Sequence, residues 1–305
     1  MDAPVAGSTT VSVIGLGNMG VPIAERILEA GFPLSVYNRH PDKAAPLVER
    51  GATLLASAAE GLRASEVCLT VLADDAALEA VVLGEAGVLA GARAGTVLVD
   101  MSTVSVDVSE RVAERAADAG VGYLRAPMSG NPTVVRGGAL TIIVSGPKEV
   151  AARVEPLLRA IGPTVLYLGE GEHARVVKLV LQTLIGGTAE LLSEAVVLGE
   201  AAGVDRAKVL EAIGASVVGS RFVEYKTAQL LEDDYAATFT TSLMLKDVDL
   251  MLDLAAQTDT RLPFTEQLRG LLDAAVDGGY GDHDFIALYL LLRDERAHQT
   301  PTRSR

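Results

Sequence analysis

Hydrophobic and polar positions follow two different patterns along this chain. Through about residue 168, short β-branched runs alternate with stretches in which apolar residues recur at helical spacing. The predicted strands are Val11–Ile14, Leu34–Asn38, Val67–Leu72, Thr96–Asp100, Tyr123–Ala126, Leu140–Ser145 and Thr164–Leu168. The predicted helices are Val21–Ala30, Pro41–Gly51, Val104–Ala119 and Lys148–Ile161. This alternation predicts an α/β fold with a mainly parallel, doubly wound sheet.

Strand signals stop after Gly171, and only helical patterns follow. The predicted helices are His173 to about Ala202, Asp205–Ala215, Arg221–Leu231, Leu243–Gln257, Pro263–Gly278 and Phe285–Arg296. We therefore expect an α/β domain over residues 1–168, an all-helical domain over 169–297 and a polar, disordered tail over 298–305. The first of these helices is apolar on all sides, so we expect it to be buried between domains or between subunits.

A glycine loop joins the first predicted strand to the first predicted helix. It reads Gly15-Leu16-Gly17-Asn18-Met19-Gly20, the G-x-G-x-x-G pattern. In such loops the first glycine makes the turn, the second lets backbone N–H groups approach a pyrophosphate, and the third lets helix and strand pack. The helix N-terminus adds unpaired donors and partial positive charge. The context on both sides of the loop predicts a Rossmann domain that binds a dinucleotide.

The end of the second predicted strand bears on which dinucleotide is bound. An NAD site usually has an acidic residue here, which accepts a hydrogen bond from the ribose 2′-OH. This chain has Asn38 followed by Arg39, with Lys43 one helical turn later. An arginine fork binds a 2′-phosphate well, so the segment favours NADP(H) over NAD(H). The alternative is a solvated basic turn that begins a helix.

Composition and charge exclude several other classes. A net charge of −14 argues against a nucleic-acid partner. No uncharged apolar run reaches the roughly 18 residues of a membrane span. The four histidines are scattered and no cysteine cluster exists, so no metal site is expected. The single cysteine, Cys68, is expected to be a buried thiol, and we expect a cytoplasmic protein.

Lys178 is the strongest candidate for the chemistry. It lies in the middle of a helix that is otherwise apolar, and lysine is seldom buried without a partner or a function. A nicotinamide enzyme that oxidises a hydroxyl needs a base near that oxygen. Burial disfavours the ammonium ion, and a lowered pKa suits such a base. The alternative is a lysine that extends along the helix to solvent at the rim.

Two further segments carry polar groups at useful places. The loop Arg125-Ala126-Pro127-Met128-Ser129-Gly130-Asn131-Pro132 follows a strand at the carboxyl end of the sheet, where α/β folds bind ligands. Its hydroxyl, backbone N–H groups and amide could hold a carboxylate, although an ordinary turn has the same composition. The segment Phe239–Asp247 brings Lys246 and Asp247 into an amphipathic helix, where a solvated ion pair is the alternative.

Together these segments resemble the β-hydroxyacid dehydrogenase family over about residues 11–295. That family includes 3-hydroxyisobutyrate dehydrogenase, tartronate semialdehyde reductase and glyoxylate/succinic semialdehyde reductase, and is related to 6-phosphogluconate dehydrogenase. The resemblance implies that Lys178 is the general acid/base and that Ser129, Gly130 and Asn131 fix the substrate carboxylate. It places Leu72, Ala73, Thr103 and Lys246 beside the cofactor, with Asp247 orienting the helix of Lys246.

The chain departs from the family pattern at the substrate loop and on the catalytic helix. Arg125 and Asn131 stand where the family has aspartate and glycine. On the helix the family shows Lys-x-x-Asn-Asn or Lys-x-x-Asn-Gln, but here Leu181 precedes Gln182. Gln182 shares a helix face with Lys178 and can point into the same pocket. Because Leu181 cannot hydrogen-bond a substrate, we expect a different substrate tail.

The leading hypothesis is an NADP-dependent dehydrogenase or reductase that acts on a 3-hydroxy acid or its semialdehyde, as a homodimer or homotetramer. Imine reductases share the two-domain plan but usually carry another residue in place of the lysine. NADPH consumption with a cyclic imine and with succinic semialdehyde would separate the two. A non-catalytic NADP-binding scaffold is the alternative from another class, and it predicts NADPH binding without turnover.

Overall fold

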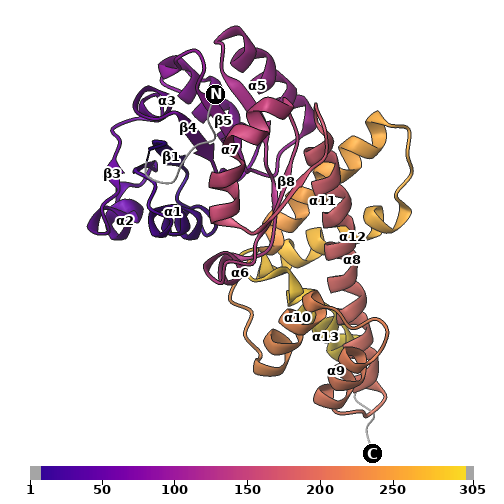
Figure 1. The fold of residues 1–305 in the computed structure, drawn as a ribbon. Coiled ribbons are helices and arrows are strands. Elements are labelled where there is room, and N and C mark those ends of the chain that lie inside the picture. Colours follow the sequence, from indigo (N-terminus) through magenta and orange to yellow (C-terminus); the bar gives the residue numbers. More distant parts are fainter. Residues whose placement is uncertain (1–7, 300–305) are drawn as a thin grey trace, which may run out of the picture. The chain divides into compact units, whose positions relative to one another are not determined.

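The computed structural model describes residues 8–299, which belong to two compact units. The first unit extends through Lys178 and contains all the strands of the described residues. The second begins at Leu179 and is helical. This is the predicted α/β class with a following helical domain (Figure 1).

Within residues 8–299, six strands form one parallel sheet in the order β3-β2-β1-β4-β5-β6. Its strands are β1 (Val11–Ile14), β2 (Leu34–Tyr37), β3 (Thr53–Leu54), β4 (Val67–Thr70), β5 (Val97–Asp100) and β6 (Gly122–Arg125). Ile14 lies opposite both Tyr37 and Thr70, and Thr70 lies opposite Asp100. The strands therefore end together at one edge of the sheet. The chain direction across the sheet reverses between β1 and β4, which is where such folds bind ligands.

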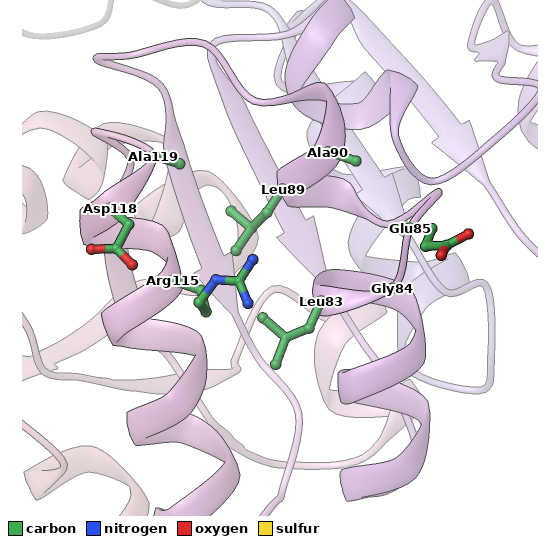
Figure 2. Close-up of a pocket in the computed structure, with 8 residues that line it drawn as sticks. All are labelled: Leu83, Gly84, Glu85, Leu89, Ala90, Arg115, Asp118 and Ala119. Atoms are coloured by element: carbon green, nitrogen blue, oxygen red, sulfur yellow. The ribbon is translucent and has the colours of Figure 1, made fainter.

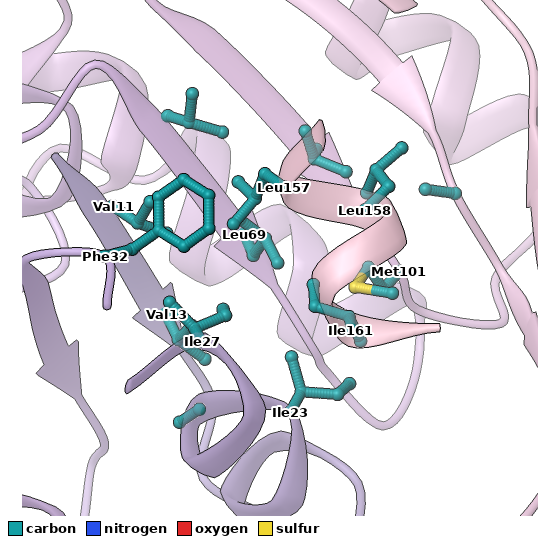
Figure 3. Close-up of a cluster of buried hydrophobic side chains, with 14 of the residues drawn as sticks. Val11, Val13, Ile23, Ile27, Phe32, Leu69, Met101, Leu157, Leu158 and Ile161 are labelled. Atoms are coloured by element: carbon teal, nitrogen blue, oxygen red, sulfur yellow. The ribbon is translucent and has the colours of Figure 1, made fainter. Parts of the chain in front are cut away.

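Helices pack on both faces of this sheet. α1 (Gly20–Glu29) and α7 (Lys148–Ile161) cover one face, where Ile23, Ile27 and Leu157 belong to the same core cluster as Val13 (Figure 3). α3 (Glu60–Ala64) and α5 (Val106–Asp118) belong to the core on the other face. The shorter helices of this unit are η1 (Pro41–Ala44), α2 (Ala45–Glu49), α4 (Asp75–Leu78), η2 (Glu79–Leu83), η3 (Val88–Gly91) and α6 (Pro132–Arg136).

The last predicted strands of the first domain form a second, smaller sheet. It contains β7 (Met128–Ser129), β8 (Thr141–Val144) and β9 (Thr164–Tyr167). β7 and β8 run antiparallel, whereas β8 and β9 are parallel. A single antiparallel bridge between Arg125 and Ser145 connects this sheet to the end of β6. The sequence pattern identified β8 and β9 as strands, but it could not show that the connection through β7 turns them away from the main sheet.

The second unit is built around the long helix α8 (His173–Ala201), whose first turns belong to the first unit. The following helices are α9 (Arg206–Ala215), α10 (Arg221–Glu232), α11 (Thr241–Gln257), α12 (Pro263–Ala275), η4 (Val276–Tyr280), η5 (Phe285–Ala287) and α13 (Leu288–Gln299). Of the tail predicted over 298–305, residues 298–299 are the last two of α13. Residues 300–305 lie outside the described residues.

The two units divide after Lys178, within α8, whereas the boundary predicted from sequence lies at 168/169. The first turns of α8 are held by groups of the first unit. Arg175 contacts Asp100, and Lys178 donates a hydrogen bond to the carbonyl of Met128. The sequence pattern shows where the strands end. It does not show how many residues of the following helix still pack with the first unit.

α8 presents one apolar stripe to the outside of the second unit. Val180, Leu184, Leu191 and Leu198 are all more than half exposed, with Leu198 at 71%. Their spacing places them on one face of the helix. Among the described residues, α8 is also the helix that could cross a membrane by length and composition alone, a test that core helices of soluble proteins pass as well.

Glu190 is a carboxyl group on α8 whose burial can be tested by the pH dependence of stability. It is 2% exposed, and neither of its oxygens has a hydrogen-bond partner among the described residues. Burial, followed by the nearby Glu194 and Glu295, raises its pKa to about 7 from 4.5. Because the folded state holds this proton more tightly than the unfolded chain, stability falls as pH rises from about 4.5 to about 7.

We therefore expect Glu190→Gln to leave stability nearly unchanged near pH 4.5 and to stabilise the protein at pH 8 by up to about 3 kcal/mol. Urea unfolding at both pH values measures the difference. Glu194→Gln, at an exposed position on the same helix, is the control and should give a smaller gain. An equal effect of Glu190→Gln at both pH values would contradict the raised pKa.

Candidate functional site

The glycine loop between β1 and α1 has the geometry that its sequence predicts. Gly15 has φ +100°, and a Cβ there would lie 2.3 Å from the carbonyl oxygen of Val71. A Cβ on Gly20 would lie 1.9 Å from the carbonyl oxygen of Gly15. These two glycines are required by the turn and by the close packing of helix and strand. A Cβ on Gly17 would meet no atom within 4 Å, so its backbone borders open space.

The N-terminus of α1 lies directly after this loop. No side chain among the described residues caps it, and its first turn holds no acidic residue. Val21 N–H donates to the carbonyl of Gly17 at 3.2 Å and Pro22 has no N–H, so this helix end attracts an anion mainly through its partial positive charge. The open backbone at Gly17 and this helix end fit the pyrophosphate of a dinucleotide. Asn18 and Met19, which are also predicted to contact the cofactor, connect Gly17 to the start of α1.

The three residues predicted to select the cofactor differ in what they do. Asn38 is committed to the fold, because its Oδ1 accepts from the backbone N–H of Leu16 at 3.0 Å and its Nδ2 donates to the carbonyl of His40 at 3.0 Å. It therefore fixes the glycine loop to the end of β2. Arg39 and Lys43 are exposed on the turn that follows. Their contact with a phosphate on the ribose stays a prediction.

The segments that follow β4 and β5 are joined by hydrogen bonds. The backbone N–H of Leu72 donates to Ser102 Oγ at 3.0 Å, and Ser102 Oγ donates to Asp100 Oδ1 at 2.6 Å. Ala73 is exposed and Thr103 is half-buried at the same edge of the sheet. The structure thus brings together Leu72, Ala73 and Thr103 at the carboxyl ends of neighbouring strands. Their contact with a cofactor stays a prediction.

Lys178 is buried, as the apolar pattern around it predicts. It is 9% exposed, and its Nζ donates to the carbonyl oxygen of Met128 at 3.0 Å. Met128 is the first residue of β7 and directly precedes Ser129, the predicted carboxylate ligand. The amine is therefore held beside the substrate loop, and the alternative of a lysine extended into solvent does not describe this side chain.

The substrate loop is shaped by its glycine and by Asn131. Gly130 is exposed with φ +145°, and a Cβ there would come within 2.9 Å of side-chain atoms of Leu140 and Val134. Asn131 caps α6, because its Oδ1 accepts from the N–H of Val134 at 2.9 Å. The cap fixes the orientation of this side chain and leaves Nδ2 as its hydrogen-bond donor. The predicted roles of Ser129, Gly130 and Asn131 stay predictions.

A buried polar network lies between β5 and the first turn of α8, and the sequence reasoning did not identify its central residue, Arg175. The Arg175 guanidinium pairs with Asp100, and the two side chains are 1% and 0% exposed. Arg175 also donates to the carbonyl of Ser102, to Ser109 Oγ at 3.2 Å and to Tyr123 OH at 3.1 Å.

Electrostatics keep Arg175 charged in this network. Burial works against the cation, but the attraction of Asp100 and further contributions from Tyr123 and Glu172 outweigh it, so the pKa of Arg175 is raised. Burial also raises the pKa of Tyr123, which remains a neutral phenol. The available signal in the sequence was an arginine on the apolar helix, one turn before Lys178.

A second ion pair lies next to this network. Arg125, at the end of β6, pairs with Glu172, and the two side chains are 8% and 9% exposed. The Arg125 guanidinium also lies 4.6 Å from the centre of the Tyr123 ring. The family has aspartate at position 125. The arginine found here is paired with Glu172, the residue directly before α8.

The remaining predicted site residues lie in the second unit. Gln182 is 4% exposed, and its Nε2 donates to Oδ2 of the fully buried Asp247. Lys246 Nζ lies 2.7 Å from Oδ1 of the same Asp247 and is one-quarter exposed. Asp247 therefore ties α11 to α8 within this unit. Gln182 uses its amide in that tie, and its predicted catalytic role, like the cofactor contact of Lys246, stays a prediction.

A large open pocket lies elsewhere in the first unit, with a volume of about 740 Å³. Leu83, Leu89 and Arg115 are among its lining side chains (Figure 2). It lies at the end of α5 that leads into the start of β6, whereas the glycine loop, Thr103 and the substrate loop follow the carboxyl ends of strands. None of the predicted site residues lines it, so it is not the candidate active site.

Two family patterns together match almost the whole chain. The pattern described as the NAD binding domain of 6-phosphogluconate dehydrogenase matches residues 10–169. The pattern described as NAD-binding of NADP-dependent 3-hydroxyisobutyrate dehydrogenase matches residues 171–292.

Related proteins of known sequence agree with these matches. An uncharacterised oxidoreductase of Bacillus subtilis is 34% identical over 91% of this chain and 98% of its own length. The 2-(hydroxymethyl)glutarate dehydrogenase of Eubacterium barkeri is 32% identical over 92% of this chain and 94% of its own. The 3-hydroxyisobutyrate dehydrogenase of Pseudomonas aeruginosa is 32% identical over 93% and 99%.

Solved structures place the fold in the same group. A 3-hydroxyisobutyrate dehydrogenase from Salmonella typhimurium matches with a TM-score of 0.86 at 24% identity, over 93% of this chain and 100% of its own. An imine reductase from Pseudomonas sp. matches with a TM-score of 0.62 at 26% identity, over 93% and 99%. With the glycine loop, the substrate loop and the buried lysine in place, the chain belongs to the β-hydroxyacid dehydrogenase family and is an NAD(P)-dependent oxidoreductase.

Proposed function

We propose that the protein is an NADP(H)-preferring dehydrogenase or reductase that acts on a 3-hydroxy acid or its semialdehyde, with Lys178 as general acid/base. The observation that carries this proposal is the buried Lys178 amine, held 3.0 Å from the carbonyl of Met128 within the substrate loop. A bound nicotinamide supplies or accepts the hydride in this family. The chain's own residues must then hold the substrate and move one proton.

Lys178 suits the proton transfer because of its surroundings. The buried amine is held beside the substrate loop by its hydrogen bond to Met128, and an ammonium group donates protons to oxygen acceptors. In the reductive direction Lys178 would protonate the carbonyl oxygen of the substrate, and in the oxidative direction it would remove the hydroxyl proton. The low exposure of Lys178 limits access of water to this step.

The substrate loop supports a carboxylate-bearing substrate. Ser129 and Gly130 follow directly after Met128, the partner of Lys178, and Asn131 caps α6. A hydroxyl, a partly exposed backbone and a helix N-terminus together favour a negative group. The Pseudomonas aeruginosa relative is named for 3-hydroxyisobutyrate and the Eubacterium barkeri relative for 2-(hydroxymethyl)glutarate, both hydroxy acids. We infer a hydroxy acid or its aldehyde for this chain as well.

Reduction of an imine is the second candidate. The structural match to the Pseudomonas imine reductase supports it, together with Leu181 and Asn131, which depart from the hydroxy-acid pattern. The lysine at position 178 favours the first candidate, because imine reductases usually carry another residue there. NADPH consumption with succinic semialdehyde but not with a cyclic imine is the expected result, and the reverse would favour imine reduction.

Lys178→Ala is expected to lower kcat by about 10²–10⁴-fold, because the proton transfer is lost. NADPH affinity, measured by fluorescence titration, should stay within about threefold of the wild-type value. Lys208→Ala, at an exposed position, is the matched control and should leave both unchanged. Loss of NADPH binding in Lys178→Ala would contradict the assigned role.

Arg39→Asp is expected to reverse cofactor preference. An acidic residue here would repel a 2′-phosphate and could accept from a 2′-OH. KM for NADPH should rise by about tenfold or more, and KM for NADH should fall. Arg63→Asp makes the same charge change at an exposed site on α3. Equal KM values for NADPH in wild type and Arg39→Asp would contradict the prediction that Arg39 binds the 2′-phosphate.

We also propose that the protein is a homodimer or homotetramer, and that the apolar stripe on α8 faces a second copy. A symmetric dimer requires a self-complementary surface, and Leu184, Leu191 and Leu198 repeat every seven residues. Leu191→Glu is expected to shift the mass from light scattering toward that of a monomer. Leu231→Glu, exposed on α10, should not. A monomeric wild-type protein would contradict this proposal.

A further inference from the structure

Arg175 has no assigned role in the proposed reaction, yet its side chain makes an extensive set of buried hydrogen bonds. Its guanidinium uses all three nitrogens: Nε donates to Ser109, Nη1 to the carbonyl of Ser102, and Nη2 to both Asp100 and Tyr123. The acceptors come from β5, the segment after β5, α5 and β6. A single side chain on the first turn of α8 therefore joins four neighbouring segments of the first unit.

Two of these connections lead to residues of the proposed site. Arg175 lies three residues before Lys178 on the same helix, so the two residues share a face one turn apart. Ser102, whose carbonyl Arg175 binds, directly precedes Thr103, which the family resemblance places beside the cofactor. Ser102 Oγ in turn accepts from the N–H of Leu72 at 3.0 Å. Arg175 thus links the helix of Lys178 to the segment predicted to line the cofactor.

We propose that Arg175 is a positioning residue for the reaction, fixing the first turn of α8, and with it Lys178, relative to the segment from Met101 to Thr103. The inference rests on the proposed function of Lys178. Asp100 is the anchor, because it also accepts from Thr70 Oγ1 at 2.7 Å and from Ser102 Oγ at 2.6 Å. The anchor therefore remains bound to the sheet when Arg175 is replaced.

The neighbouring Arg125–Glu172 pair cannot provide the same constraint alone. Nε of Arg125 and Oε2 of Glu172 are buried without a hydrogen-bond partner among the described residues. Glu172 also lies just before the helix rather than on the turn preceding Lys178. Ser145 adds a further tie, since its Oγ accepts from the N–H of Ala174 at 3.1 Å. These contacts hold the start of α8 in place, while Arg175 fixes its orientation.

The first test measures docking without any substrate. Hydrogen exchange of the full-length protein, with and without NADPH, is compared between wild type and Arg175→Gln. Amides of residues 172–182 and 100–104 should exchange about tenfold faster or more in the variant. Arg111→Gln removes an arginine from an exposed pair with Glu79 in the same unit and is the matched control. Unchanged exchange in both segments of Arg175→Gln would overturn the proposal.

The second test separates positioning from general stability. With the fastest substrate of a hydroxy-acid and semialdehyde panel, kcat of Arg175→Gln should fall by about 10–100-fold, because small displacements of a catalytic group are costly. KM for NADPH should change far less. In the Lys178→Ala background Arg175→Gln should produce no further loss, because it acts through Lys178. An equal loss in both backgrounds would show a merely structural role and overturn the proposal.

If Arg175→Gln does not fold, Arg175→Lys is the variant that tests the proposal. A lysine retains the charge opposite Asp100 but lacks the planar fork that reaches the other three acceptors. Its kcat and exchange rates should lie between those of wild type and the glutamine variant, and wild-type values for both would contradict the proposal. Turnover that survives Lys178→Ala would disprove the acid/base role of Lys178, whereas the exchange experiment would still decide whether Arg175 docks the helix.

Discussion

The ion pair between Asp100 and Arg175 is the interaction on which the arrangement of the candidate site depends. Both charges are removed from water, and an isolated buried charge is costly unless it is paired and hydrogen-bonded. Here each charge satisfies the other, and hydroxyl groups and a carbonyl fill the remaining positions. As a result, a long apolar helix can begin directly against the carboxyl edge of the sheet.

That edge exists because the strands are in register. Each parallel pair aligns Ile14, Tyr37, Thr70, Asp100 and Arg125 across the sheet. The segments after these strands therefore emerge side by side, which is the geometric reason that the glycine loop, Thr103 and the substrate loop occupy one edge. The net charge of −14 does not oppose an anionic cofactor, because Arg39 and Lys43 are exposed at this same edge.

Most of the fold and part of the candidate site could be predicted from the sequence because their signals are local. The glycine loop is read from six consecutive residues, and α7 begins and ends where its apolar spacing predicts. Lys178 stood out because a charge interrupts an apolar pattern. The partners of Asp100 could not be predicted, since Arg175 is 75 residues away in the chain. The sequence predicts that Asn131 and Gln182 face the substrate, but it does not reveal that Asn131 also caps a helix or that Gln182 also bonds to Asp247.

The sequence by itself determined the element types, the dinucleotide loop and the family, because hydrophobic period and glycine spacing encode backbone geometry over short distances. Only the tertiary structure decided that β8 and β9 leave the main sheet, that the first turns of α8 belong to the first unit, and which polar side chains are already occupied. These outcomes depend on pairing between distant segments. A buried polar group takes whichever partner the packing brings within hydrogen-bond distance, and sequence spacing does not specify that partner.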